Sequence, residues 1–281
     1  MNRRAFIGAG AAIAAGAGLI GYTTQIEPHW LEIVERDLPV AKLPRALNGA
    51  KLAHVSDLHA CSYVDENYLT RSLDRLRAHA PDITVFTGDF VSWEPGRTDR
   101  VKEAQLRRVL SHLPHGRLAT IATLGNHDYG NTWRDLRIAA QITSIVRETG
   151  ITVLRNEVAT VGGLDVIGVE DLWSGQADTR AAFEMRTGEA AIALCHNPDA
   201  LDDLDWSGYA GWVLAGHTHG GQCKPPFLDP PILPVKNKRY SAGEIAVDDK
   251  RKLYISRGVG HLLKVRFNVR PEITVFTLRA A

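Results

Sequence analysis

From residue 49 onward, short apolar runs alternate with stretches in which apolar residues recur every three or four positions. The apolar runs have the length and composition of buried strands, and they lie at 51–56, 83–87, 118–124, 190–195 and 212–215. Helical periodicity is found between the first strands, at 68–80, 101–113 and 133–148. A final block, 243–278, contains further strands separated by turn residues. This alternation predicts an α/β sandwich.

Each of the five predicted strands is followed at once by acidic, amide or imidazole side chains. The segments are Asp57-Leu58-His59, Gly88-Asp89, Gly125-Asn126-His127-Asp128, His196-Asn197-Pro198 and Gly216-His217-Thr218-His219. In open α/β sheets, ligands bind outside the carboxyl ends of the strands. We therefore expect these polar residues to converge on one site.

The residue types at the strand ends favour a metal centre. Carboxylate, amide and imidazole ligands without a thiolate suit Mn, Fe or Zn in mixed oxygen and nitrogen coordination. Asp57 and His59, like His217 and His219, are two residues apart, which places each pair on one side of an extended segment. Asp89, at a strand tip, could bridge two ions. Two ions about 3.5–4 Å apart can hold a hydroxide nucleophile and stabilise charge during hydrolysis of a phosphate ester.

Composition excludes several other classes of protein. The chain of 281 residues is 44% hydrophobic and 23% charged, which is typical of a globular protein and excludes disorder, collagen and a disulfide scaffold. Its 33 basic and 32 acidic residues are nearly balanced, and no stretch gathers Lys and Arg into a stripe. We therefore expect no nucleic acid as a partner.

The N-terminal residues have a different character from the rest of the chain. Arg3 and Arg4 precede an uncharged run rich in Ala and Gly, 5–20, and this arrangement resembles a twin-arginine export signal. We predict a signal peptide or an uncleaved N-terminal anchor over 1–24, an extension over 25–48 and a catalytic domain over 49–281. The twin-arginine export machinery is then an expected partner, and the expected location is the periplasm, the membrane surface or the cell wall.

Net charge does not by itself predict binding to a membrane. Without Arg3 and Arg4 the chain has 31 basic and 32 acidic residues, a net charge of −1. Electrostatic attraction to anionic lipid is therefore not expected from net charge alone, and peripheral membrane association stays open as an alternative. We expect a monomer.

Taken in order, the five polar segments resemble the signature of the calcineurin-like metallophosphoesterases. The resemblance extends from residue 49 to the C-terminus. Further segments are similar to the exported YaeI/YkuE-like phosphodiesterase subgroup of that family, namely 195–198, 216–222, 254–260 and 270–273. The resemblance implies a four-layer α/β/β/α sandwich of two mixed β-sheets flanked by helices.

The resemblance also implies a role for each candidate residue. It implies two divalent metal ions, the first held by Asp57, His59, Asp89 and His219 and the second by Asp89, Asn126, His196 and His217. His127 matches the catalytic histidine of the family, which acts beside the metals without binding them. Asp128 could orient His127, or it could cap a local turn.

The expected function is that of a binuclear metal-dependent phosphodiesterase or pyrophosphatase, with attack by a metal-bound hydroxide and His127 as general acid. The family also contains enzymes that cleave the pyrophosphate of UDP-2,3-diacylglucosamine, so the expected substrate is a small-molecule or lipid-linked phosphoester. Arg257 and His261 could contact a substrate phosphate, the alternative being solvated surface charge. A catalytically weak metal-dependent binding protein of the cell wall or envelope is an alternative from another class.

Overall fold

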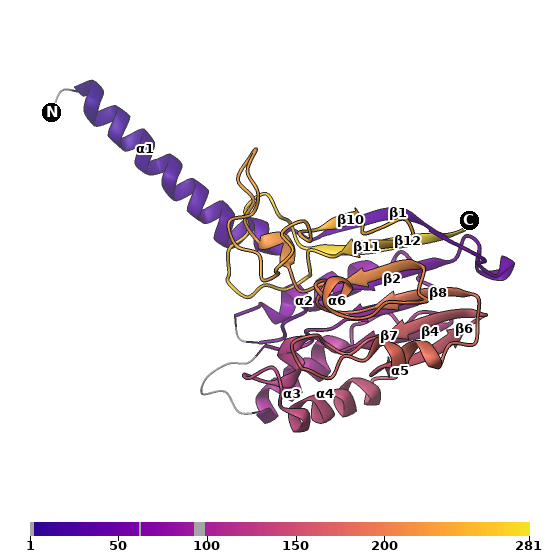
Figure 1. Cartoon of the computed structure of the whole chain (residues 1–281). Helices are drawn as coiled ribbons and strands as arrows, with labels where there is room; N and C mark the ends of the chain where they lie inside the picture. The colour runs from indigo at the N-terminus through magenta and orange to yellow at the C-terminus, as the bar shows by residue number, and fades with distance from the viewer. Residues whose placement is uncertain (1–2, 62, 93–98) are drawn as a thin grey trace.

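The computed structural model describes residues 3–61, 63–92 and 99–281, with side chains from residue 12 on. Two six-stranded β-sheets pack face to face, and helices cover their outer faces (Figure 1). This arrangement confirms the predicted four-layer α/β/β/α sandwich.

The first sheet is mixed and contains the N-terminal half of the strands together with the last one. Its order is β1 (Glu32–Val40), β12 (Glu272–Ala280), β2 (Lys51–Val55), β3 (Ile83–Thr87), β4 (Ala119–Thr123) and β5 (Thr152–Val153). Strands β2 to β5 are parallel, β12 is antiparallel to β2, and β1 is parallel to β12. The outer face is covered by α2 (Glu66–Arg77), α3 (Asp99–Leu110) and α4 (Leu136–Glu148).

The second sheet is also mixed, with a parallel centre and an antiparallel strand at each edge. Its order is β10 (Gly243–Ala246), β11 (Arg251–Ile255), β9 (Gly211–Ala215), β8 (Ala190–Leu194), β7 (Leu164–Gly168) and β6 (Glu157–Val161). Two short helices pack on its outer face, α5 (Thr179–Glu184) and α6 (Ala200–Asp203). Single helical turns occur at Tyr22–Ile26, Glu27–His29, Arg45–Leu47, Asn126–Tyr129 and His219–Gly221.

Apolar side chains fill the space between the layers. The core between the sheets includes Leu52 and Val85 from the first sheet and Ile192 and Leu214 from the second, all fully buried. Because both faces of each central strand are covered, these strands are nearly continuous apolar runs. The five predicted strands and the three predicted long helices are confirmed, with ends that differ by up to three residues.

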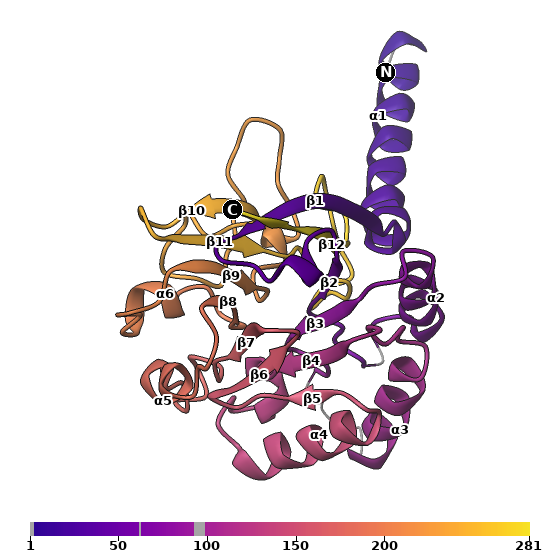
Figure 2. The ribbon, with the colours of Figure 1, turned by 90° about the vertical axis from the view of Figure 1, so that its right-hand side faces the viewer.

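The N-terminal region forms a helix and then a strand. Helix α1 (Arg3–Gly21) extends away from the two sheets (Figures 1 and 2). None of the described helices has the length and apolar character required to span a bilayer. The side chains of Arg3 and Arg4, on which the export prediction depends, lie outside the described part. Residues 25–48, which the sequence separated from the domain, contribute β1, and all nine residues of β1 pair with β12.

Candidate metal centre

The backbone turns sharply in the polar segments that directly follow the strands. Strands β2, β3 and β4 are parallel in one sheet and β8 and β9 in the other, so their carboxyl ends lie at a common end of the sandwich. Most of the predicted ligands there adopt left-handed backbone angles, with φ of 55°, 48°, 54°, 72° and 50° for Asp57, His59, Asp89, His217 and His219. Such angles are uncommon for residues other than glycine and cluster at functional sites.

Two glycines let these segments approach one another closely. A Cβ atom on Gly88 would lie 2.2 Å from the backbone nitrogen of Gly125, and the φ of Gly88 is +85°. A Cβ atom on Gly216 would lie 2.0 Å from Ser56 Oγ and 2.4 Å from Asp57 Oδ2. Any side chain at either position would push the ligand segments apart.

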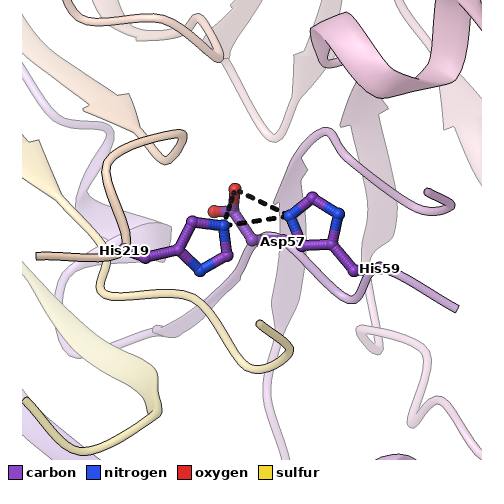
Figure 3. Close-up of side chains that lie close together, drawn as sticks. All are labelled: Asp57, His59 and His219. Atoms are coloured by element: carbon purple, nitrogen blue, oxygen red, sulfur yellow. Dashed lines mark hydrogen bonds and ion pairs between the residues drawn. The ribbon is translucent and has the colours of Figure 1, made fainter. Parts of the chain in front are cut away.

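The first group of ligands contains Asp57, His59 and His219, which point toward one another from two segments far apart in the sequence (Figure 3). The Nε2 atoms of the two histidines are 2.9 Å apart. Asp57 Oδ1 lies 3.4 Å from His219 Nε2 and 3.8 Å from His59 Nε2. Donor atoms that share one ion at bond lengths of about 2.1 Å lie roughly 3.0–3.4 Å apart, so most of these spacings suit a common cation.

The second group contains Asp89, Asn126, His196 and His217. Asn126 Oδ1 is 3.1 Å from His196 Nε2 and 3.0 Å from His217 Nδ1. The two imidazole nitrogens are 3.2 Å apart. Three donors from different segments therefore surround one point, at the spacing expected of ligands to one ion.

Asp89 lies between the two groups. Its Oδ2 atom is 3.1 Å from His196 Nε2 in the second group and 3.6 Å from His59 Nε2 in the first. Its Oδ1 atom accepts a hydrogen bond from the backbone N–H of His127, at 2.9 Å. One carboxylate thus contacts both groups, as the bridging role predicted from the sequence requires.

Three of the candidate ligand histidines are also contacted at the ring nitrogen that points away from the ligand group. The outward nitrogens of His59, His196 and His217 lie 2.6, 2.6 and 2.9 Å from the Ser92 hydroxyl, the Thr87 carbonyl and the Pro234 carbonyl. A partner on the second nitrogen fixes the tautomer and orientation of a metal-binding histidine. This pattern is typical of metal ligands.

The charge of the buried groups suits cations. Burial lowers the pKa of His59 and of His219 well below the usual value, and it lowers that of His217 to about 3, so all three imidazoles are neutral donors. Burial also opposes the charged form of His196, but the carboxylates of Asp89, Asp57 and Asp171 together outweigh it and raise the pKa of His196 to about 10, so this ring holds a proton that a bound cation would displace. Three neutral imidazoles, a fourth that gives up its proton, two buried carboxylates and an amide oxygen fit two divalent metal ions.

His127 stands beside the two groups with a free ring atom. It is half-buried, and its ring packs edge-on against that of His59 with centroids 5.1 Å apart. Its Nδ1 atom has no hydrogen-bond partner among the described residues. His127 also lines a cavity of about 280 Å³ together with Ser92 and Gly130. His127 therefore lies at the wall of a cavity that a ligand could enter, and its buried Nδ1 atom is not engaged by the described residues.

Asp128 is bonded to the backbone of the site. Its carboxylate accepts N–H groups from Gly125, Asp89 and Phe90, each at 2.9 Å, and from Val91 at 3.3 Å. These bonds hold the turn after β4 against the loop after β3. Of the two roles considered for Asp128, they correspond to the cap of a local turn.

The candidate substrate residues Arg257 and His261 contact protein groups. The Arg257 guanidinium pairs with Glu272 and, at 2.8 Å, with Glu32. His261 is fully buried, with Nε2 3.1 Å from the Tyr63 carbonyl. Both candidate substrate side chains are therefore engaged by protein groups in this structure.

Two residues near the site were missed by the sequence analysis. Trp133 and Trp173 stack with centroids 4.8 Å apart, and Trp173 packs edge-on against His217 at 4.5 Å. They form an aromatic wall beside the second group. Nothing in the local sequence marked them, because the two residues are 40 positions apart and meet only in the fold.

We expect Ser92→Ala to weaken metal binding about 10–100-fold, as is typical when a hydrogen bond behind a ligating histidine is lost. The reason is the 2.6 Å contact of the Ser92 hydroxyl with His59 Nδ1. Titration of the metal-depleted protein with Mn²⁺ measures the affinity. Ser111→Ala, at an exposed residue directly after α3, is the matched control, and equal affinities for the two variants would contradict the assigned role of Ser92.

Comparison with known proteins agrees with the motif resemblance. Residues 50–221 match the family model described as calcineurin-like phosphoesterase. The chain is 32% identical to the uncharacterized metallophosphoesterase YkuE of Bacillus subtilis, covering 100% of this chain and 98% of the relative. It is also 32% identical to phosphodiesterase YaeI of Escherichia coli, over 99% of both. UDP-2,3-diacylglucosamine pyrophosphatase LpxG of Chlamydia trachomatis is 27% identical over 90% of both chains.

Proposed function

Because the chain belongs to the calcineurin-like phosphoesterase family and is thus a metal-dependent phosphoester hydrolase, we propose that it cleaves a phosphodiester or pyrophosphate bond at a binuclear centre. The observation that carries the proposal is the position of Asp89, whose carboxylate contacts both buried ligand groups. His127 stands beside them with an unpartnered ring nitrogen.

The proposed ligands follow the two groups. Asp57, His59, Asp89 and His219 would hold one ion, and Asp89, Asn126, His196 and His217 the other. The proposed ions are Mn, Fe or Zn, which accept oxygen and nitrogen donors. When bound, two such ions polarise a phosphoryl oxygen and activate the attacking water.

The residues of the chain position and protonate the substrate. His127 would hold a proton on its ring and give it to the departing oxygen as the P–O bond breaks. Asp89 and Asp128 fix the backbone on either side of His127, because Asp89 accepts the N–H of His127 and Asp128 accepts that of Gly125. The imidazole is thus held in place before the substrate arrives.

A lipid-linked substrate such as UDP-2,3-diacylglucosamine is one proposed substrate, and a small soluble phosphodiester is the other. The first is favoured by the similarity to LpxG over nine-tenths of both chains, and the second by the similarity to phosphodiesterase YaeI. The cavity of about 280 Å³ beside His127 has room for only part of a large substrate.

Hydrolysis of bis-p-nitrophenyl phosphate by the protein loaded with Mn²⁺ tests the proposal. A panel of phosphodiester, nucleotide pyrophosphate and lipid pyrophosphate substrates then identifies the bond. No turnover of any of them with both metals bound would overturn the proposal in favour of an envelope binding protein, since that alternative needs the metals but no reaction.

We further propose export by the twin-arginine pathway, with the domain acting in the periplasm or at the outer surface of the membrane. Recognition of the signal depends on both guanidinium groups, so Arg3→Lys combined with Arg4→Lys should leave the protein in the cytoplasm although the charge is unchanged. Cell fractionation measures this. A double variant exported as efficiently as the parent chain would exclude the pathway, and a domain retained inside the cell would have access to cytoplasmic UDP-linked lipids.

A further inference from the structure

Exposed apolar side chains are concentrated in three segments of the molecule. Among the described side chains, ten of the sixteen large exposed hydrophobic residues lie within 13–30, 227–232 and 262–263. Phe227 is completely exposed, and the exposed fractions of Ile232 and Leu263 are 73% and 66%. Soluble monomers seldom gather exposed apolar side chains in this way unless the surface binds something.

The three segments are joined to one another. The backbone N–H of Arg266 donates to the Thr23 carbonyl at 2.9 Å, which connects the loop 261–267 to the helical turn directly after α1. The Gln222 side chain donates to the Leu263 carbonyl at 2.8 Å, and the Lys224 N–H donates to the Phe267 carbonyl at 2.8 Å. The loop 224–235 and α1 project from the same end of the sandwich in both views (Figures 1 and 2).

We call the exposed side chains of the two loops the apolar rim, which consists of Phe227, Leu228, Ile232, Leu262 and Leu263. The apolar rim is attached directly to the metal centre. The Pro234 carbonyl, in the first loop, is 2.9 Å from His217 Nε2. Arg266, in the second, is fully buried with one guanidinium nitrogen 3.4 Å from His219 Nδ1. Each of the two loops that carry the rim therefore also contacts a candidate metal ligand.

We propose that the apolar rim docks the enzyme onto a bilayer containing anionic lipid, so that it acts on phosphoesters presented at the membrane surface. The uncharged segment of α1 leaves the domain at the same end of the sandwich as the loop 224–235 (Figure 1), and an uncharged helix beside apolar loop tips favours lipid as the partner. The exposed amines of Lys224 and Lys264 flank the rim on the two loops, where they can contact lipid phosphates.

The shape of the apolar rim suits insertion into the interfacial region of a bilayer. Its side chains stand on two loop tips, and Pro225, Pro226, Pro230 and Pro231 restrict the first of these loops. A stiff loop loses little conformational freedom when its apolar tip enters lipid. The exposed Lys224 and Lys264 outnumber Asp229, the one carboxylate of the two loops, and so supply local attraction that the net charge of the chain does not.

Binding of the full-length chain to vesicles of phosphatidylcholine and phosphatidylglycerol (7:3), measured by flotation, tests the proposal. Phe227→Ser combined with Leu228→Ser should weaken binding about tenfold or more, because two apolar side chains no longer leave water. The matched control is Leu118→Ser with Met185→Ser, which removes two exposed apolar side chains elsewhere and should bind as the parent chain does. Pure phosphatidylcholine vesicles should bind the parent chain about tenfold more weakly than the anionic vesicles.

The substrate inference rests on the proposed function, and its test is separate from the test of that function. Turnover of bis-p-nitrophenyl phosphate should be equal in the parent chain and in the Phe227→Ser and Leu228→Ser double variant, since neither residue belongs to the metal centre. Absence of turnover of this substrate and of the whole substrate panel would refute the proposed function, while vesicle binding would still test the docking proposal. Equal vesicle binding by the double variant and the parent chain, or no vesicle binding by the parent chain, would overturn the docking proposal.

Discussion

Asp89→Asn should remove both metals from the protein, whereas His219→Ala should remove one. Asp89 contacts the second group at 3.1 Å and the first at 3.6 Å through a single oxygen, Oδ2. An amide in its place takes one negative charge from both sites at once, and a neutral group binds a divalent cation far less strongly than a carboxylate does. His219 contacts only the first group.

Elemental analysis of the purified variants measures the result. We expect near-complete loss of metal in Asp89→Asn, partial retention in His219→Ala and turnover close to background in the first. Asp37→Asn is the matched control, because that exposed carboxylate pairs with Arg279 and is remote from the metal centre. Occupancy in Asp89→Asn equal to that of the parent chain would refute the bridging role.

The convergence of the candidate ligands could be predicted from sequence because their positions depend on few contacts. Strand β3 begins and ends where the sequence placed it, at Ile83 and Thr87. Parallel pairing then brings Asp89 and Asp57 to one edge, since Val55 of β2 pairs with Phe86 of β3. The strand-end pattern therefore predicts that these residues converge, whereas the assignment of each candidate ligand to one of two ions depends on the resemblance to the family.

Other features depend on residues that are distant in the chain. The alternation of charged and apolar residues in β1 is weak. The strand is held in the sheet by its pairing with β12, which lies more than 230 positions away in the chain. The Arg257 guanidinium resembled an anion-binding group in the sequence, yet it pairs with Glu32 and Glu272, which the sheet edge brings to it. A charged side chain cannot be assigned to substrate until the carboxylates around it are known.

His127 is the residue for which sequence and geometry together make the sharpest chemical prediction. Its backbone N–H is held by Asp89 Oδ1, which fixes where its side chain leaves the turn. Its ring packs against His59 at 5.1 Å and against Trp133 at 6.2 Å, and its Nδ1 has no partner in the described residues. The ring is thus oriented by packing, and its buried Nδ1 atom is not engaged by the described residues.

We expect His127→Ala to slow hydrolysis of an alkyl phosphodiester about 10²–10⁴-fold, the usual contribution of a general acid. An alkoxide leaves poorly without a proton, whereas p-nitrophenolate leaves readily, so bis-p-nitrophenyl phosphate should be slowed much less. Parallel turnover measurements on the two substrates, with elemental analysis of the same samples, provide the comparison. Loss of a metal ligand would instead depress both substrates together and lower the metal content.

The contrast between the two substrates decides the role of His127. A histidine that also stabilises charge on the phosphoryl oxygens would slow the activated substrate somewhat, but the alkyl ester would still be affected more. His112→Ala, on the exposed surface after α3, is the control and should leave both rates unchanged. If His127→Ala slows both substrates by the same factor while both metals stay bound, the imidazole does not protonate the leaving group and instead orients the phosphoryl group.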